Sequence, residues 1–173
     1  MKKISLKNVL YQSGFLTGVV AITWGIIQFI MGTHYENDVV SQIVGSIILI
    51  SGIVLGQLAF RKENGGLVSF SECLKVGVGI SLVQAILGLL YYFLLTNFIE
   101  PDFNIKALQI SYAQMVESNP EFTSQMNEQT FIENSEPFMW IAYPAILLFS
   151  LFFGLLFSLC SGILIKKSKA LQP

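Results

Sequence analysis

Residues 65–75 read Gly-Gly-Leu-Val-Ser-Phe-Ser-Glu-Cys-Leu-Lys, and an uncharged, largely apolar run continues through residues 76–98. The paired glycines can adopt the left-handed backbone that a chain reversal needs. Ser69 and Glu72 have the S-x-x-E spacing of a capping box, in which the serine accepts from a backbone N–H and the glutamate reaches back. The stretch therefore predicts a turn, a helix that begins near Phe70, and a membrane crossing.

Composition places the whole chain among membrane proteins. Its 173 residues are 53% hydrophobic and 12% charged, with a mean hydropathy of +0.64. About a quarter of the residues in a soluble domain are charged. A helix needs ~20 apolar residues to cross a bilayer core of about 30 Å. Four runs reach that length, at residues 14–33, 39–60, 76–96 and 138–165.

We therefore predict an all-α membrane protein with a single integral membrane domain over residues 1–173. With their polar ends included, its four transmembrane helices should cover residues 9–33, 39–60, 70–97 and 137–165. The short loop at residues 32–38 favours an antiparallel hairpin of the first two spans, and the last two should form a second hairpin. Residues 98–136 should form a partly helical extracytoplasmic loop between spans three and four.

The basic residues indicate how the spans are oriented. Lys and Arg near the ends of spans mark the cytoplasmic side. They cluster before the first span, between the second and third, and after the fourth: Lys2, Lys3, Lys7; Arg61, Lys62, Lys75; Lys166, Lys167, Lys169. This pattern predicts that both termini are cytoplasmic. Most acidic residues lie in the other two loops, which is consistent with that orientation.

A cleaved signal peptide is the alternative interpretation of the basic start. The first apolar run is longer than the usual signal core of about 7 to 15 residues, and no convincing small-x-small cleavage site follows it. We therefore expect the first run to remain as a membrane span.

Each predicted span carries small residues four positions apart. The longest row consists of Ser150, Gly154, Ser158 and Gly162. In lipid, such rows let helix backbones approach closely. The row is expected to pack against either a neighbouring span or another subunit.

Four glutamines, Gln28, Gln42, Gln57 and Gln84, lie in or near three of the spans. Interhelical amide hydrogen bonds could set the register of the bundle, or the amides could line a polar pathway. No Asp, Glu, Lys, Arg or His lies deep in a predicted span. This absence disfavours an ion-coupled pump, since such pumps use intramembrane ionisable groups.

The first loop contains the only histidine of the sequence. His34, Glu36 and Asp38 alternate there and could converge on a metal ion from an extended segment. Carboxylates and one imidazole are nevertheless commonplace in a tight loop. We therefore predict no metal site.

The loop between spans three and four shows a helical pattern. Apolar residues at positions 105, 108, 112 and 115 recur at the spacing of an amphipathic helix. Asn119-Pro120 and Ser135-Glu136-Pro137 have the composition of helix starts. We expect short helices that lie over the outer mouth of the bundle.

The sequence lacks the motifs of familiar chemistry. It contains no Gly-rich phosphate loop, HExxH, CxxC or GxSxG. Cys73 and Cys160 map to the predicted cytoplasmic half, where thiols stay reduced. The basic residues lie at span ends rather than in a patch, which disfavours nucleic-acid binding. We predict no catalytic, cofactor-binding or metal-binding residues, and no enzymatic activity.

The order of features is similar to that of a known family. The sharpest parts are the phrase from Phe70 to Gly77, after the paired glycines, and Glu100-Pro101-Asp102-Phe103 at the end of the third span. The chain resembles a family of small four-span inner-membrane proteins of Bacteroidota, catalogued as a domain of unknown function. The resemblance implies the cytoplasmic (inner) membrane and no known activity or ligand.

Two functions from different classes fit these observations. The first is a non-enzymatic accessory protein or self-associating helical bundle, favoured by the small-residue rows. Its partners would be the lipid bilayer and either a second copy or another membrane protein. The second is a small transporter or channel for a neutral or lipid-like solute, favoured by the glutamines. An enzyme that acts on lipid comes third.

Overall fold

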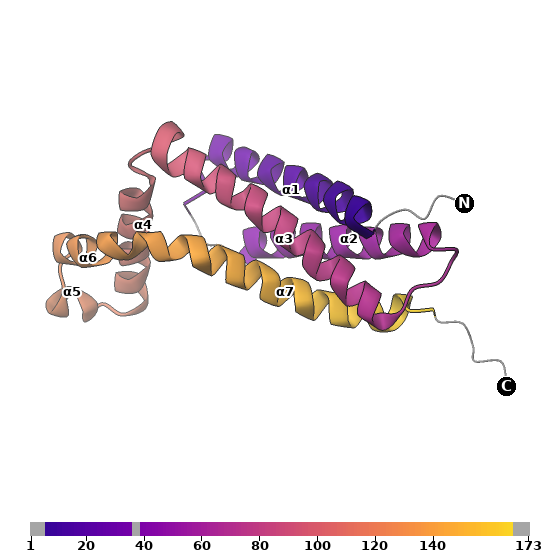
Figure 1. Ribbon diagram of the computed structural model, residues 1–173. Helices are drawn as coiled ribbons and strands as arrows, with labels where there is room; N and C mark the ends of the chain where they lie inside the picture. The colour runs from indigo at the N-terminus through magenta and orange to yellow at the C-terminus, as the bar shows by residue number, and fades with distance from the viewer. Residues whose placement is uncertain (1–5, 36–38, 168–173) are drawn as a thin grey trace.

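The computed structural model describes residues 6–35 and 39–167, which form a helical bundle (Figure 1). Its long helices are α1 (Leu6–Met31), α2 (Val39–Glu63), α3 (Phe70–Leu94) and α7 (Ala142–Ile165). All four are long and apolar enough to cross a membrane. The predicted all-helical fold with four candidate spans is confirmed.

Helix α3 is the centre of the bundle. It packs most extensively against α7 and α1, and α2 contacts all three of the other long helices. The chain thus forms two hairpins, α1 with α2 and α3 with α7, joined through the contact between α1 and α3.

The two ends of the bundle differ in chemistry. We call the end where α1 and α3 begin and α2 and α7 end the basic end (Figure 1). It carries Arg61, Lys62, Lys75, Lys166 and Lys167. We call the opposite end, which carries residues 32–35 and the short helices, the loop end.

At the basic end, the turn before α3 forms as the sequence predicts. Gly65 and Gly66 have positive φ angles of +69° and +83°. Ser69 Oγ accepts from the Glu72 backbone N–H at 3.3 Å, and the Glu72 carboxylate accepts from the Ser69 backbone N–H at 2.8 Å. The capping box is complete, and α3 begins at Phe70.

The same turn is tied to the end of α7. Arg61 Nε donates to the Gly66 carbonyl oxygen at 3.2 Å, and its Nη1 donates to the Ile165 carbonyl oxygen at 3.4 Å. Val68 and Lys167 form an isolated antiparallel β-bridge. These contacts close the basic end.

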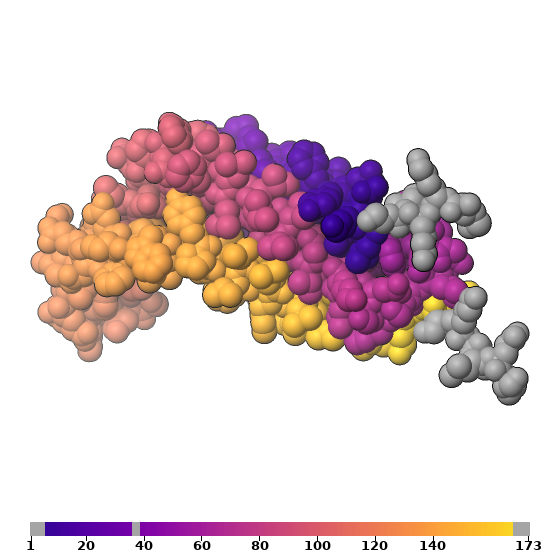
Figure 2. All heavy atoms as spheres, viewed as in Figure 1, coloured from indigo at the N-terminus to yellow at the C-terminus, as the bar shows by residue number. Residues whose placement is uncertain are grey.

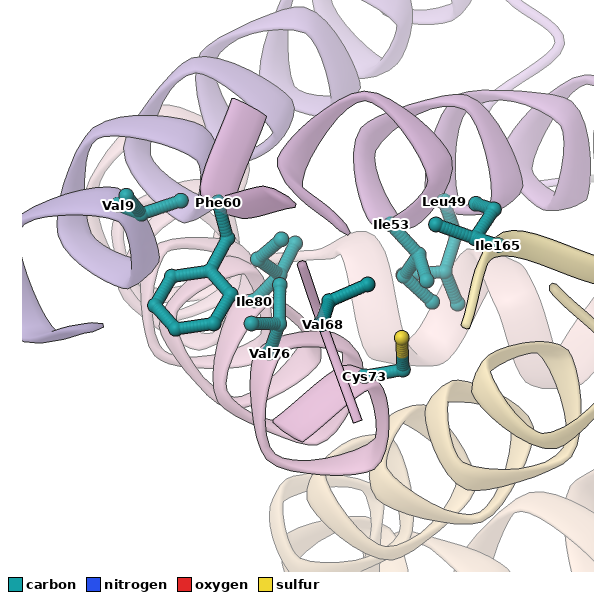
Figure 3. Close-up of a cluster of buried hydrophobic side chains, with 9 residues drawn as sticks. All are labelled: Val9, Leu49, Ile53, Phe60, Val68, Cys73, Val76, Ile80 and Ile165. Carbon is teal, nitrogen blue, oxygen red and sulfur yellow. The ribbon is translucent and has the colours of Figure 1, made fainter. Parts of the chain in front are cut away.

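The buried core lies in the half of the bundle next to the basic end (Figure 3). It draws on all four long helices and on the turn between α2 and α3. Its members are Val9, Leu49, Ile53, Phe60, Val68, Cys73, Val76, Ile80 and Ile165.

Small residues bring α3 and α7 together, and Figure 2 shows the two helices in contact along much of one face. A Cβ atom added at Gly77 would collide with the Ser158 side chain, and one added at Gly154 would collide with the Ser81 side chain. Gly154, Ser158 and Gly162 of the predicted row therefore pack against α3 of the same chain. This contact decides between the two packing partners that the sequence left open.

The loop end carries a short helical segment. A π-helical turn, η1 (Leu95–Ile99), extends α3 and is followed by α4 (Phe103–Ser118), α5 (Phe122–Gln125) and α6 (Glu128–Ser135). The rings of Tyr112, Phe122 and Phe131 pack together, with centroids 5.7–6.2 Å apart. The prediction of short helices between spans three and four is confirmed.

A 3-10 turn, η2 (Glu136–Ile141), joins α6 to α7. The resulting candidate span, Glu128–Ile165, has 38 residues. At 1.5 Å per residue it is roughly 57 Å long, whereas a bilayer core is about 30 Å thick. Its first turns must therefore project from a membrane.

Of the two predicted helix starts in this loop, one is wrong and the other is the start of a 3-10 helix. Pro120 precedes α5, which begins at Phe122, while Asn119 Oδ1 accepts from the Glu121 backbone N–H at 3.3 Å. Ser135 is the N-cap residue of η2, with Pro137 in its first turn, although Ser135 makes no side-chain capping hydrogen bond and its backbone angles, φ −93° and ψ −33°, are already helical. Asn127, which has extended angles, caps α6 by accepting from the Thr130 backbone N–H at 2.9 Å.

Candidate functional site: a lateral crevice

The predicted glutamines do not form one pathway. Gln57, fully buried in α2, donates from Nε2 to the Cys73 carbonyl oxygen and to Ser158 Oγ, each at 3.1 Å. Ser158 Oγ also donates to the Cys73 carbonyl oxygen at 2.8 Å. This node joins α2, α3 and α7 within the packed half. It supports the interpretation of Gln57 as a residue that sets helix register.

Gln28 also connects helices. Its Nε2 donates to Ser41 Oγ at 2.5 Å, which holds α1 to α2 at the loop end. Interhelical hydrogen bonds of this kind are worth roughly 0.6–2 kcal/mol in a membrane.

Gln42 and Gln84 share a different environment. A hollow of about 560 Å³ opens between α2, α3 and α7. Its polar wall consists of Gln42, Ser46, Gln84 and Ser150. Its apolar wall includes Leu49, Phe149, Phe153 and Phe157.

A second hollow of about 170 Å³ adjoins the first between α1, α3 and α7. It is lined by Ala21, Ile22, Ala85, Gly88, Tyr91 and Ile146, and it shares Gln84 and Ser150 with the first hollow. We call the two hollows together the crevice. Gln84 and Ser150 stand where they meet. Among the described residues that line the crevice, none carries a formal charge.

Gln84 has an unsatisfied group in this position. Its Oε1 atom is buried and accepts no hydrogen bond from the described residues. A buried acceptor without a donor costs about 1–3 kcal/mol. Gln57 Oε1 is unpaired as well, but Gln57 is fully enclosed in the packed core. Gln84 alone of the two lines a cavity in the described structure.

A separate polar cluster lies at the loop end. The Glu100 carboxylate accepts from His34 Nε2 at 2.8 Å, from Lys106 Nζ at 2.6 Å, and from the Tyr35 hydroxyl. We call these four residues the Glu100 clasp. It binds the loop after α1 to the junction between α3 and α4. The His34 ring also contacts Tyr35, with centroids 3.9 Å apart, and Phe103, at 5.8 Å.

The clasp shifts the pKa values of Glu100, Lys106 and Tyr35. Hydrogen bonds from Lys106, Tyr35 and His34 lower the pKa of Glu100 from 4.5 to about 2. Glu100 in turn raises the pKa of Lys106. Burial, followed by the hydrogen bond to Glu100, raises the pKa of Tyr35. Glu100 is therefore an anion at neutral pH.

The alternative of a metal site in the first loop gains no support. His34 uses its Nε2 on Glu100, and Glu36 and Asp38 lie outside the described residues. Residues 6–35 and 39–167 contain no group of three His, Cys, Asp or Glu side chains that could hold a metal ion. Cys73 is buried, Cys160 is exposed, and both are free thiols.

Four apolar helices of membrane-spanning length, with short helices between the last two, define the class as a multi-pass helical membrane protein. The chain belongs to the family described as "Protein of unknown function (DUF4199)", whose model matches residues 12–167. The match covers nearly all of the four helices, the crevice and the Glu100 clasp. No curated protein and no solved structure matches the chain.

Proposed function

We propose that the protein is a non-enzymatic membrane protein that binds and carries a neutral, lipid-like solute in the crevice. The observation that carries this proposal is Gln84, a residue that lines an uncharged cavity and has a buried, unpaired side-chain oxygen. A buried acceptor costs free energy until a donor reaches it. A bound solute would supply that donor.

The surroundings of the crevice favour a lipid-like solute. The larger hollow, of about 560 Å³, lies in the range of 300–1,000 Å³ that is usual for ligand pockets. Phe149 and Phe153, at its rim on α7, are 63% and 43% exposed and face outward from the bundle. In a membrane such side chains meet lipid, so a solute could enter from the bilayer. The absence of charge on the described walls favours a neutral molecule.

We also propose an orientation, in which the basic end is cytoplasmic and the loop end faces away from the cytoplasm. The support is the cluster of Lys and Arg at the basic end. The family resemblance favours a bacterial inner membrane. The crevice would then open into the outer half of that membrane.

Saturable photolabelling tests the proposed binding. The purified protein in lipid nanodiscs would be irradiated with a long-chain alcohol that carries a diazirine on its chain. We expect labels at residues 42–49, 84–91 and 146–157, with competition by the unlabelled alcohol. Uniform labelling of all lipid-facing helices, without competition, would refute the proposal. For the carrier step, Gln84→Leu should reduce protein-dependent transfer of the alcohol between vesicles.

Association with a second copy or another membrane protein remains the second candidate. The small-residue row on α7 no longer supports it, since α3 covers Gly154, Ser158 and Gly162 and Ser150 lines the crevice. A different observation does, namely a groove of about 260 Å³ between α1 and α2, whose rim includes the exposed residues Leu16 and Leu55. Ser51→Trp would obstruct this groove. A self-associating protein should then lose chemically crosslinked dimers, whereas unchanged crosslinking would count against this surface.

A further inference from the structure

We propose that the solute is a single-chain amphiphile with a hydroxyl or amide N–H at its polar end. Gln84 and Ser150 would receive that group, and Gly45 and Gly88 would keep the crevice open for the chain. This inference rests on the proposed function and names the chemical class of its solute.

The two glycines differ from the other glycines in the helices. At most helical glycines, a neighbouring side chain packs closely against the backbone. Val83 does so at Gly14, Leu87 at Gly18 and Ser158 at Gly77. A Cβ atom added at Gly45 or Gly88 would meet nothing within 4 Å. Among the helical glycines of the described chain, these two alone have such open surroundings.

Both unpacked glycines line the crevice, Gly45 in the larger hollow and Gly88 in the smaller one. A glycine inside a helix is destabilising relative to alanine, because it loses more conformational freedom on folding. Close helix packing offsets that cost at Gly77, but packing within this chain offers no such compensation at Gly45 or Gly88. Space for a bound molecule accounts for both positions.

The chemistry of Gln84 defines the polar end of that molecule. Oε1 can only accept a hydrogen bond, so its partner must be a donor. An ether, an ester carbonyl or a quaternary ammonium has no suitable proton, and a carboxylate would face a cavity without a basic residue among its described walls. A hydroxyl fits best, because it can donate to Gln84 and accept from the Ser150 hydroxyl.

The shape of the crevice defines the apolar end. Beyond Gln84, Leu49, Phe153 and Phe157 provide an apolar wall in the larger hollow. The larger hollow, of about 560 Å³, has the volume of a usual ligand pocket, and the smaller one adds about 170 Å³. One hydrocarbon chain, rather than the two chains and charged headgroup of a phospholipid, matches these dimensions.

Three photoreactive probes with the same chain test this inference: an alcohol, its methyl ether and the corresponding carboxylic acid. Saturable labelling of crevice residues should be strongest for the alcohol. Loss of one hydrogen bond, worth about two- to tenfold in affinity, should weaken labelling by the ether accordingly. Gln84→Leu should remove the difference between alcohol and ether.

Gly88→Leu and Gly45→Leu should abolish alcohol labelling while the melting temperature stays at or above that of the wild type. Ile86→Phe, which changes an exposed side chain of α3, is the matched control and should label normally. Equal crevice labelling by all three probes, or normal labelling of both glycine variants, would overturn this inference but leave the proposed function intact. Absence of crevice labelling with any probe would overturn both.

Discussion

The side-chain amide of Gln57 donates to Ser158 Oγ over 3.1 Å, although 101 positions separate the two residues. Both side chains are fully buried. Their hydrogen bond holds α2 to α7 in the packed half of the bundle, whereas farther toward the loop end the crevice lies between the same helices. Substitutions in the packed half and in the half that contains the crevice should therefore have different effects on stability.

Ser158 should tolerate removal of its hydroxyl better than enlargement. Ser158→Ala loses the hydrogen bonds to Cys73 and Gln57 and should cost about 1–2 kcal/mol. Ser158→Leu would also collide with α3 at Gly77, adding about 1–3 kcal/mol of overpacking. Denaturant titration in detergent micelles measures both. Crosslinked dimers should be equally abundant for Ser158→Ala and the wild type, and a selective loss would show that the row serves an intermolecular contact.

Gly77→Ala and Gly88→Ala should have opposite effects on stability. At Gly77, the added methyl would collide with Ser158 and should destabilise the protein by about 1–3 kcal/mol. At Gly88, the methyl has space, so the gain in helix propensity should stabilise the protein by about 0.5–1 kcal/mol. Thermal unfolding of the two variants side by side checks the prediction. Equal destabilisation would show that the space beside Gly88 is absent in the protein.

Gln84→Leu should be more stable than the wild type and yet defective in binding. The substitution removes a buried acceptor that costs about 1–3 kcal/mol when unpaired. In a chain of this size, 1 kcal/mol corresponds to about 2–4 °C in melting temperature. Gln57→Leu is the informative comparison, since it also removes two hydrogen bonds. A lower melting temperature for Gln84→Leu would indicate that the amide has a partner.

The Glu100 clasp should make stability depend on pH in the acidic range. The folded-state pKa of Glu100 is lowered from 4.5 to about 2, so its stabilisation is present above about pH 4.5 and is lost as the pH falls toward 2. Glu100→Gln should lower the melting temperature at pH 7 by roughly 2–4 °C, a modest effect because the Lys106 arm is exposed and screened.

The difference between wild type and Glu100→Gln should shrink steadily below pH 4.5, because the unfolded chain then binds a proton at Glu100 while the folded protein does not until the pH approaches 2. Lys106→Met is the control for the ion pair, and it should reproduce part of the effect at pH 7. A difference that stayed constant from pH 7 down to about pH 2 would mean that the carboxylate charge does not stabilise the clasp.

The proposed orientation can be checked by labelling with a membrane-impermeant maleimide. In a cysteine-free background, Asn127→Cys should react in intact cells, and Lys167→Cys should react only after the membrane is permeabilised. Both positions are exposed, so access is limited by the membrane. The reverse pattern would invert the topology.

Local signals in the sequence were sufficient to predict the four long helices and the turn before α3. The Ser69 capping box and the four apolar runs each depend on residues that are close in sequence, so their physical basis was visible. Asn127, the cap of α6, also offered a local signal. Pro137 correctly marked the start of η2, whereas Pro120 lies two positions before the start of α5.

Only part of the candidate site could be predicted from the sequence. Gln84 stood out as a polar residue in an apolar run, but its unpaired oxygen depends on what surrounds it. Gly45 lies four positions after Ser41, in the same pattern as the glycines that pack helices, and Gly88 gave no sequence signal, so only their three-dimensional surroundings distinguish the two. The partners of Glu100 in the first loop lie 65 and 66 positions away, and no local pattern connects them.

The node at Gln57 also has a consequence for biosynthesis. At about 5–20 residues per second, roughly 5 to 20 s separate the synthesis of Gln57 from that of Ser158, its acceptor 101 positions later. Cys73, whose carbonyl oxygen is the other acceptor, is made soon after Gln57 and can accept a hydrogen bond from the Gln57 amide until Ser158 is made. Helices α2 and α3 thus enter the membrane with one of the two Gln57 hydrogen bonds formed, and the second forms when α7 is inserted.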